Sequence, residues 1–260
     1  MDKSIFQINL IGYRSLLRKE INRIFRIWVQ TIIPPAITMT LYFVIFGSLI
    51  GSRIGVIDEY PYMTFIAPGL IMMSIITNSF GNVVSSFFSG KLQRHLEELL
   101  VSPMANITIL LGYVSGGVIR GLSVASLVTV VALFFTNLTV AHPFITGLVI
   151  ILISICFSLA GLINAVYANN FDDISIIPTF VLTPLTCLGG VFFSIEMLPG
   201  IWQTIARLNP MLYMINSFRY GMLGVSDISI TTGLTVIVTF TVSLFIIAYY
   251  LLKTGKGIRD

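Results

Sequence analysis

The sequence predicts an all-α integral membrane protein with six transmembrane helices, an N-terminal amphipathic interfacial helix and a re-entrant outer hairpin between helices 5 and 6. Of the 260 residues, 56% are hydrophobic and 10% are charged, whereas a soluble domain carries roughly a quarter charged residues. Six apolar stretches are long enough to cross a bilayer, and Lys and Arg are concentrated on one side of them. So few charges cannot cover a water-exposed surface, so residues 1–260 are expected to form one membrane domain.

The six spans follow from length and charge. A helix needs about 20 apolar residues to cross the hydrocarbon core, and in lipid a helix satisfies its own backbone polar groups. Five stretches reach that length without a formal charge, and a sixth contains only Arg120. The predicted spans are residues 28–50, 66–88, 107–135, 144–168, 174–195 and 232–252. Prolines inside them predict local kinks.

The basic residues predict the orientation. Eleven Lys and Arg residues lie in the N-terminal segment, the connection after the second span and the tail, against three on the opposite side. Because cytoplasmic connections carry the excess of Lys and Arg, both termini are expected on the cytoplasmic side of a bacterial inner (cytoplasmic) membrane. This topology explains the net charge of +4 without nucleic acid.

Residues 1–27 predict an amphipathic helix at the cytoplasmic interface. Leu10, Tyr13, Leu17, Ile21, Ile24 and Trp28 share one face, and Arg14, Arg18, Asn22 and Arg26 share another. Cations on such a face lie near anionic headgroups. A basic flank that only sets topology is the alternative.

Residues 196–231 are too polar to span and too apolar for an ordinary loop. Two short helical pieces separated by Asn209-Pro210 predict a re-entrant hairpin in the outer leaflet. In the third span, the spacings Gly112/Gly116 and Gly117/Gly121 predict close helix packing, either within the chain or at a dimer seam.

The most charged internal segment is 91–103. Its leucines recur at helical spacing before Ser102-Pro103, which predicts a short amphipathic helix. That helix either rests in the headgroups as a connector or inserts leucines into a groove on a partner.

Motifs of nucleotide-binding and hydrolytic enzymes are absent from the sequence. No G-x-x-x-x-G-K-[ST] loop, HExxH motif or GxSxG elbow occurs. Cys156 and Cys187 lie in apolar runs and are expected to be reduced thiols, far in sequence from His95 and His142. We therefore expect no enzyme activity, no metal and no cofactor in this chain, so an active mechanism needs energy from elsewhere.

Four stretches resemble the ABC-2 type export permeases. The segment Arg94, Leu96, Glu97, Glu98, Leu99, Leu100, Ser102 and Pro103 is similar to their coupling helix, which has a basic residue, Leu-Glu-x-Leu-Leu, a small residue and proline. Phe65–Leu70, Gly189–Ser194 with Met197–Pro199, and Leu208–Pro210 with Phe218-Arg219 match three further family patterns. The match runs in order along the whole chain and most resembles the subgroup of drug, lipo-oligosaccharide and polysaccharide exporters.

The resemblance implies a homodimer of twelve spans with two copies of a cytoplasmic ABC ATPase, which bind ATP and Mg. The coupling segment would contact that ATPase, and the outer hairpin would close the pathway. The substrate class implied is amphipathic, lipid-linked, glycan or drug-like. A non-transporting scaffold or sensor with the same fold is the alternative. A secondary transporter is disfavoured, because its spans commonly carry ionisable residues.

Seven residues are candidates for the pathway or its gate: Asn78, Asn82, Arg120, Phe192, Phe193, Asn209 and Pro210. Arg120 lies about 22 Å from the outer end of its span, from 1.5 Å per residue, so its long stem can snorkel to the cytoplasmic interface. Snorkelling or a structural pair, and a role with substrate or gate, both stay open from the sequence.

Overall fold

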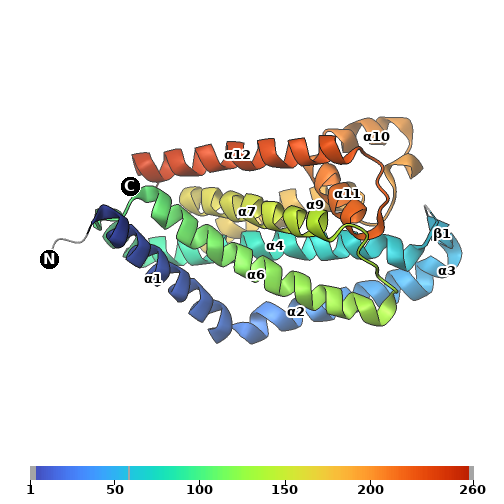
Figure 1. Cartoon of the computed structure of the whole chain (residues 1–260), viewed down its shortest axis with the longest axis horizontal. Coiled ribbons are helices and arrows are strands. Elements are labelled where there is room, and N and C mark those ends of the chain that lie inside the picture. Colours follow the sequence, from blue (N-terminus) through green and yellow to red (C-terminus); the bar gives the residue numbers. More distant parts are fainter. Residues whose placement is uncertain (1–3, 58, 258–260) are drawn as a thin grey trace.

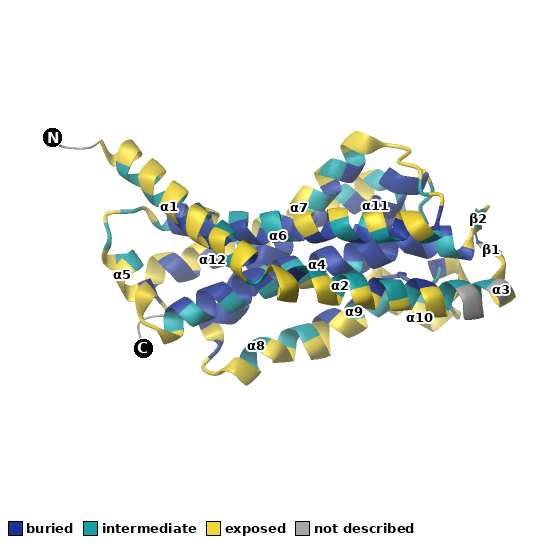
Figure 2. Cartoon of the chain, turned by 90° about the horizontal axis from the view of Figure 1, so that it is seen from below, coloured by how far each residue is buried: buried dark blue, intermediate teal, exposed yellow. Residues whose placement is uncertain are grey.

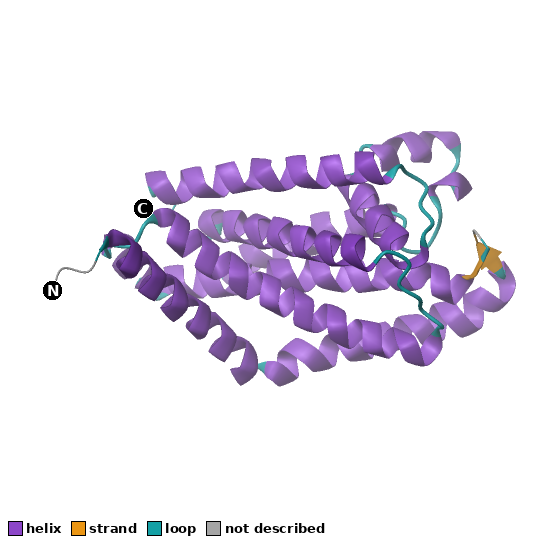
Figure 3. Ribbon diagram, in the orientation of Figure 1, coloured by secondary structure: helices purple, strands orange, loops and turns teal. Residues whose placement is uncertain are grey.

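A computed structural model describes residues 4–57 and 59–257 of the chain. Helices make up nearly all of it (Figure 3), and the long ones run side by side with both termini at one end (Figure 1). In this described part, six helices are long and apolar enough to cross a membrane. They are Trp28–Gly47, Tyr62–Leu92, Asn106–Phe135, Pro143–Tyr167, Phe171–Leu188 and Ile230–Thr254. The predicted all-α class and the number of spans are confirmed.

The elements in chain order are α1 (Ile5–Arg26), α2 (Trp28–Tyr42), η1 (Phe43–Ile50), α3 (Gly51–Ile54), β1 (Val56–Ile57), β2 (Tyr60–Pro61), α4 (Tyr62–Leu92), α5 (His95–Val101), α6 (Asn106–Phe135), α7 (Pro143–Tyr167), α8 (Phe171–Ile177), η2 (Pro178–Leu182), α9 (Thr183–Leu188), η3 (Ile195–Met197), α10 (Gly200–Arg207), α11 (Pro210–Leu223) and α12 (Ile230–Thr254). The strands β1 and β2 form one antiparallel ribbon.

Helix α4 is the centre of the bundle and is buried along most of its length (Figure 2). It packs against α6 and α7, and small residues permit the close approach. A Cβ at Gly161 of α7 would lie 2.6 Å from the carbonyl oxygen of Phe80 in α4, and one at Gly121 of α6 would meet the hydroxyls of Ser79 and Ser154. The glycine spacing of the third span therefore serves packing within the chain.

Helix α1 lies obliquely across the bundle at the end that holds the termini (Figure 1). Its predicted polar face is exposed, but its buried stripe is Leu16, Glu20 and Ile24, whereas Leu10 and Trp28 are 37% and 53% exposed. The stripe that packs on the bundle thus overlaps the apolar face expected at the interface only at Ile24. Gly112 and Gly116 of α6 leave space for Leu16 and Glu20, and this selects the stripe.

The fifth span is shorter than expected. Its helical segments α8, η2 and α9 end at Leu188, whereas the predicted span continued to residue 195. Gly190 has φ of 81°, a left-handed conformation that glycine adopts without steric cost and that ends a helix. The wide π-helical turn η2 begins at Pro178, and a second one, η1, interrupts the first span.

Short helices fill the end of the molecule opposite the termini, where α3, β1, α10 and α11 lie together (Figure 1). The two helical pieces expected around Asn209-Pro210 are α10 and α11. Helix α11 is buried against α4, α7 and α12, and Gly224, with φ of 79°, ends it. The second of the two expected pieces is therefore part of the core.

Candidate functional site

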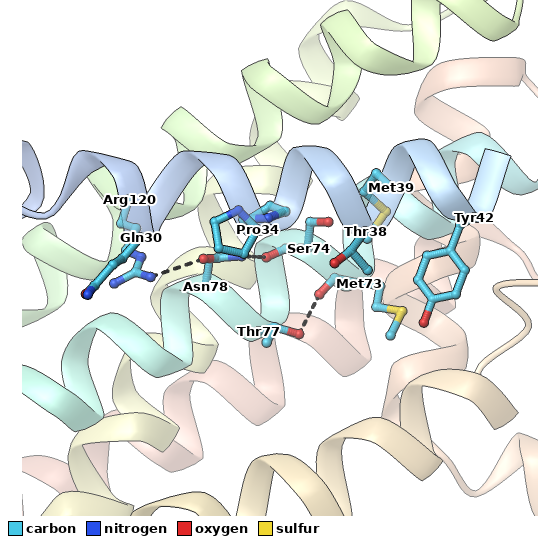
Figure 4. Close-up of a pocket in the computed structure, with 11 residues that line it drawn as sticks. Gln30, Pro34, Thr38, Met39, Tyr42, Met73, Ser74, Thr77, Asn78 and Arg120 are labelled. Carbon is cyan, nitrogen blue, oxygen red and sulfur yellow. Dashed lines mark hydrogen bonds between the residues drawn. The ribbon is translucent and has the colours of Figure 1, made fainter. Parts of the chain in front are cut away.

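A pocket of about 330 Å³ lies between α2, α4 and α6. Its lining combines hydroxyl, amide, sulfur and proline side chains with one cation (Figure 4). The lining residues are Gln30, Pro34, Pro35, Thr38, Met39, Tyr42, Met73, Ser74, Thr77, Asn78 and Arg120. Small-molecule sites typically have volumes of about 300–1,000 Å³, so the space suffices for part of an amphiphile.

The structure brings two of the predicted pathway residues together in this pocket. Arg120 extends from the middle of α6 toward α4, where its Nη2 donates to Asn78 Oδ1 over 3.4 Å. Asn78 in turn donates to the carbonyl oxygen of Ser74 at 3.0 Å. Figure 4 shows Arg120 at one end of the lining, beside Gln30, and Tyr42 at the other. Arg120 is thus paired with an amide inside the bundle, one of the arrangements left open by the sequence.

Asn82, one helical turn along α4, belongs to a different cluster. Arg23 of α1 donates to the Asn82 carbonyl oxygen at 2.8 Å and to its Oδ1 at 2.7 Å. The same guanidinium pairs with Glu20 at 3.2 Å and donates to Ser85. Glu20 is fully buried and accepts a hydrogen bond from Ser86 at 2.5 Å. This ion pair attaches α1 to α4.

Glu20 and Arg23 were not singled out from the sequence. The signal that points to them is the spacing of Leu16, Glu20 and Ile24, which places a carboxylate in the middle of a stripe with period four. On α4, Ser74, Asn78, Asn82 and Ser86 have the same spacing. Such polar stripes within apolar segments indicate faces that turn toward protein rather than lipid.

The remaining pathway candidates lie toward the α10 end. Phe192 stacks on Phe46 with ring centroids 4.5 Å apart and meets the edge of Tyr42, a pocket residue, at 5.9 Å. Asn209 donates to the Leu185 carbonyl oxygen at 2.6 Å and caps α11, which begins at Pro210. Within the described structure, neither Phe193, Asn209 nor Pro210 lines the pocket.

Arg219 is a further residue whose position the sequence did not reveal. It was counted as an outer-side cation, yet it is 1% exposed. Its guanidinium lies 4.0 Å from the centroid of the Phe65 ring and donates to the Gly190 carbonyl oxygen at 2.5 Å. Three of the family-like stretches therefore meet at this side chain, its own included, and it stabilises the turn after α9.

Helix α5 occupies the coupling segment, at the same end as the termini (Figure 2). Arg94 precedes it with φ of 59°, and Ser102 ends it in an extended conformation before Pro103. Glu97 and Glu98 are exposed. The segment thus presents a short acidic helix at the surface.

Three leucines of this segment are turned toward the core. Leu96 is 2% exposed and lies against Gly90, and Leu99 and Leu100 are half-buried against the same core. The chain itself already buries Leu96, so insertion into a partner would require this side chain to leave the core. The exposed apolar groups are Leu92, at 57%, and Val101, at 85%.

Comparisons with known proteins agree on one family. The family described as ABC-2 type transporter matches residues 12–223. The chain is 54% identical over 250 residues to the inner membrane transport permease YadH of Escherichia coli K12, covering 96% of this chain and 98% of that protein. It is 26% identical over 213 residues to nodulation protein J of Rhizobium leguminosarum bv. viciae, covering 80% of each chain. These matches confirm the resemblance found in the sequence: the chain belongs to the ABC-2 type transporter family.

Proposed function

We propose that this protein is the membrane permease subunit of an ATP-binding cassette exporter in the bacterial inner membrane. It moves an amphipathic, lipid-linked, glycan or drug-like substrate outward, and a separate ATPase subunit supplies the energy. The observation that carries the proposal is the family match over residues 12–223, which includes five of the six spans, the pocket and α5. The name of the Escherichia coli relative, an inner membrane transport permease, supports the location and the activity.

The ATPase would dock at the end of the molecule that holds α5 and both termini. The excess of Lys and Arg supports a cytoplasmic position for this end. Exposed Glu97, Glu98 and Val101 offer a contact that requires no rearrangement of the buried leucines. ATP and Mg would then be bound by two copies of the ATPase.

The substrate would pass along the face of α2 and α4. The pocket with Arg120 and Asn78 lies midway along the bundle, and the aromatic group of Tyr42, Phe46 and Phe192 lies beyond it toward the α10 end. An aromatic contact that separates a polar pocket from the outer surface can act as a gate. The hairpin of α10 and α11 would lie in the outer leaflet.

A second copy of the chain would complete the pathway. The first, fifth and sixth spans are the least covered parts of the bundle, and large apolar side chains such as Ile37, Leu41 and Phe180 are exposed on the first and fifth. These faces would meet lipid and the second copy in a homodimer. Helix α1, with Arg14, Arg18 and Arg26 exposed, would lie at the cytoplasmic headgroups.

Reconstitution with the cognate ATPase tests the proposal. The purified chain is expected to hydrolyse no ATP, to form a stable complex with the ATPase, and to support ATP-dependent movement of substrate across proteoliposomes. A Walker-lysine variant of the ATPase is the control. ATP turnover by the chain alone would contradict the permease assignment, and a stable complex that never transports across candidate lipids, glycans and drugs would favour the scaffold.

A further inference from the structure

The guanidinium of Arg120 is under-satisfied for a cation in a membrane span. In the described part of the chain, no ion pair joins it to a carboxylate, and its buried Nε has no hydrogen-bond partner. Its bond to Asn78 is long, at 3.4 Å, and the acceptor is neutral. An unpaired charged side chain inside a membrane span is costly, so compensation by an anion is expected.

Nearby charges do not supply that anion. Arg23, which acts on Arg120 electrostatically, is itself a cation. Glu20, the carboxylate of the adjoining cluster, is already bonded to Arg23 and Ser86. The end of the pocket near Arg120 and Gln30 is therefore positive and rich in N–H donors (Figure 4).

The rest of the pocket suits an apolar body. Pro34 and Met39 of α2 lie opposite Met73 of α4, and Tyr42 lies at the far end (Figure 4). Pro35 of α2 also lines the pocket. The hydroxyl of Thr77 is bonded to a backbone carbonyl oxygen within its own helix at 2.8 Å, which reduces its demand for a ligand. The charged group thus lies at one end of the pocket, and the two methionines and Tyr42 lie toward the other, with the hydroxyls of Thr38 and Ser74 beside them (Figure 4).

We propose that this pocket binds an amphiphile through an anionic oxygen group, a phosphate or a carboxylate, held by Arg120, with the apolar part against α2. The planar guanidinium matches such a group with two parallel hydrogen bonds. The anion can belong to a bilayer lipid or to the exported molecule. The assignment of the anion to the exported molecule rests on the proposed function.

Binding to the full-length chain, purified without the ATPase in an uncharged detergent, tests the anion requirement. The probe is dodecyl phosphate, its uncharged match is dodecanol, and the measurement is stabilisation against thermal unfolding as a function of probe concentration. Wild-type protein is expected to bind the phosphate at least about tenfold more tightly than Arg120→Gln does, since a charge-assisted hydrogen bond is worth about 1.5–3 kcal/mol. Arg26→Gln, which removes an exposed cation outside the pocket, should bind like the wild type.

Two further variants keep the test decisive if Arg120→Gln folds poorly. Asn78→Asp places a carboxylate beside the guanidinium, so it should lose phosphate binding without a lower unfolding temperature. Arg120→Lys should keep part of the affinity. Equal phosphate binding in wild type, Arg120→Gln and Asn78→Asp would overturn the proposal, and so would equal binding of dodecanol and dodecyl phosphate.

Assays on the complex with the ATPase distinguish the two sources of the anion, a bilayer lipid and the exported molecule. Dioctanoyl phosphatidylglycerol that binds through Arg120 without changing ATP turnover would identify a resident lipid. Stimulation of turnover by dodecyl phosphate, lost in Arg120→Gln, would identify the charge of the exported molecule. Both outcomes agree with an anion site. Absence of any complex with an ATPase would contradict the proposed function and leave the binding result on the isolated chain as the test of the site.

Discussion

The buried pair of Glu20 and Arg23 predicts that loss of either charge destabilises the bundle, and that loss of both costs less than the sum of the two single losses. Glu20 is fully buried, whereas the Arg23 side chain is 24% exposed. Removal of one partner of a buried pair costs about 3–5 kcal/mol. Because water reaches Arg23, we expect about 2–4 kcal/mol for Glu20→Gln, which corresponds to a fall in Tm of about 5–10 °C.

The double variant tests whether the two side chains are coupled. In Glu20→Gln/Arg23→Gln no charge remains in the cluster, so its Tm should fall by less than the sum of the two single variants. Interacting residues show coupling of about 0.5–3 kcal/mol. Thermal unfolding of the purified chain in a single detergent measures all four proteins. The matched control is Glu98→Gln, whose side chain is 81% exposed and whose loss should leave Tm unchanged.

Two results would refute the argument. A wild-type Tm in Glu20→Gln would mean that the buried carboxylate contributes nothing to the attachment of α1. Additive effects in the double variant would mean that the two side chains act independently, whatever their 3.2 Å separation.

Three other predictions follow from the structure. In intact cells, a cysteine at Glu196 should react with an impermeant reagent and one at Gln93 should not; labelling at Gln93 would reverse the orientation. Val101→Asp should weaken pull-down of the ATPase at normal expression, and normal pull-down would exclude that contact. Leu96→Ala should instead lower Tm, because it removes a buried side chain at a cost of about 2–5 kcal/mol. Gly161→Ala should lower the free energy of unfolding by about 1–3 kcal/mol through overpacking, since its Cβ would lie 2.6 Å from a backbone oxygen of α4. The measurement is Tm, and an unchanged Tm would show that α4 and α7 separate freely.

The spans could be predicted because hydrophobicity over about 20 residues is a local property. Their ends depend on single backbone conformations, so the fifth span was extended past Gly190. The stripe of α1 that packs on the bundle was not predicted for another reason. It is set by Gly112 and Gly116 on a helix more than eighty residues away in sequence, so the spacing of Leu16, Glu20 and Ile24 alone does not show what it packs against.

The candidate site was predicted in part for similar reasons. Asn78 and Arg120 are visible as polar groups within apolar segments, and the structure brings them together. Leu96 illustrates the opposite case, because its helical spacing is the same whether its face meets a partner or its own chain. Only the position of Gly90 and the core beneath it decide between the two.

Helix α1 lies between the proposed ATPase contact and the polar cluster next to the pocket. Ser15 and Lys19 of α1 line a cavity with His95 and Glu98 of α5. One turn further along α1, Arg23 is bonded to α4 at Asn82. Asn82 is one turn from Asn78, the partner of Arg120. A displacement of α5 that carries α1 with it must therefore either move the polar stripe of α4 or break charge-assisted hydrogen bonds inside the bundle. Since those bonds are stronger than neutral ones, α1 and α4 are expected to move together.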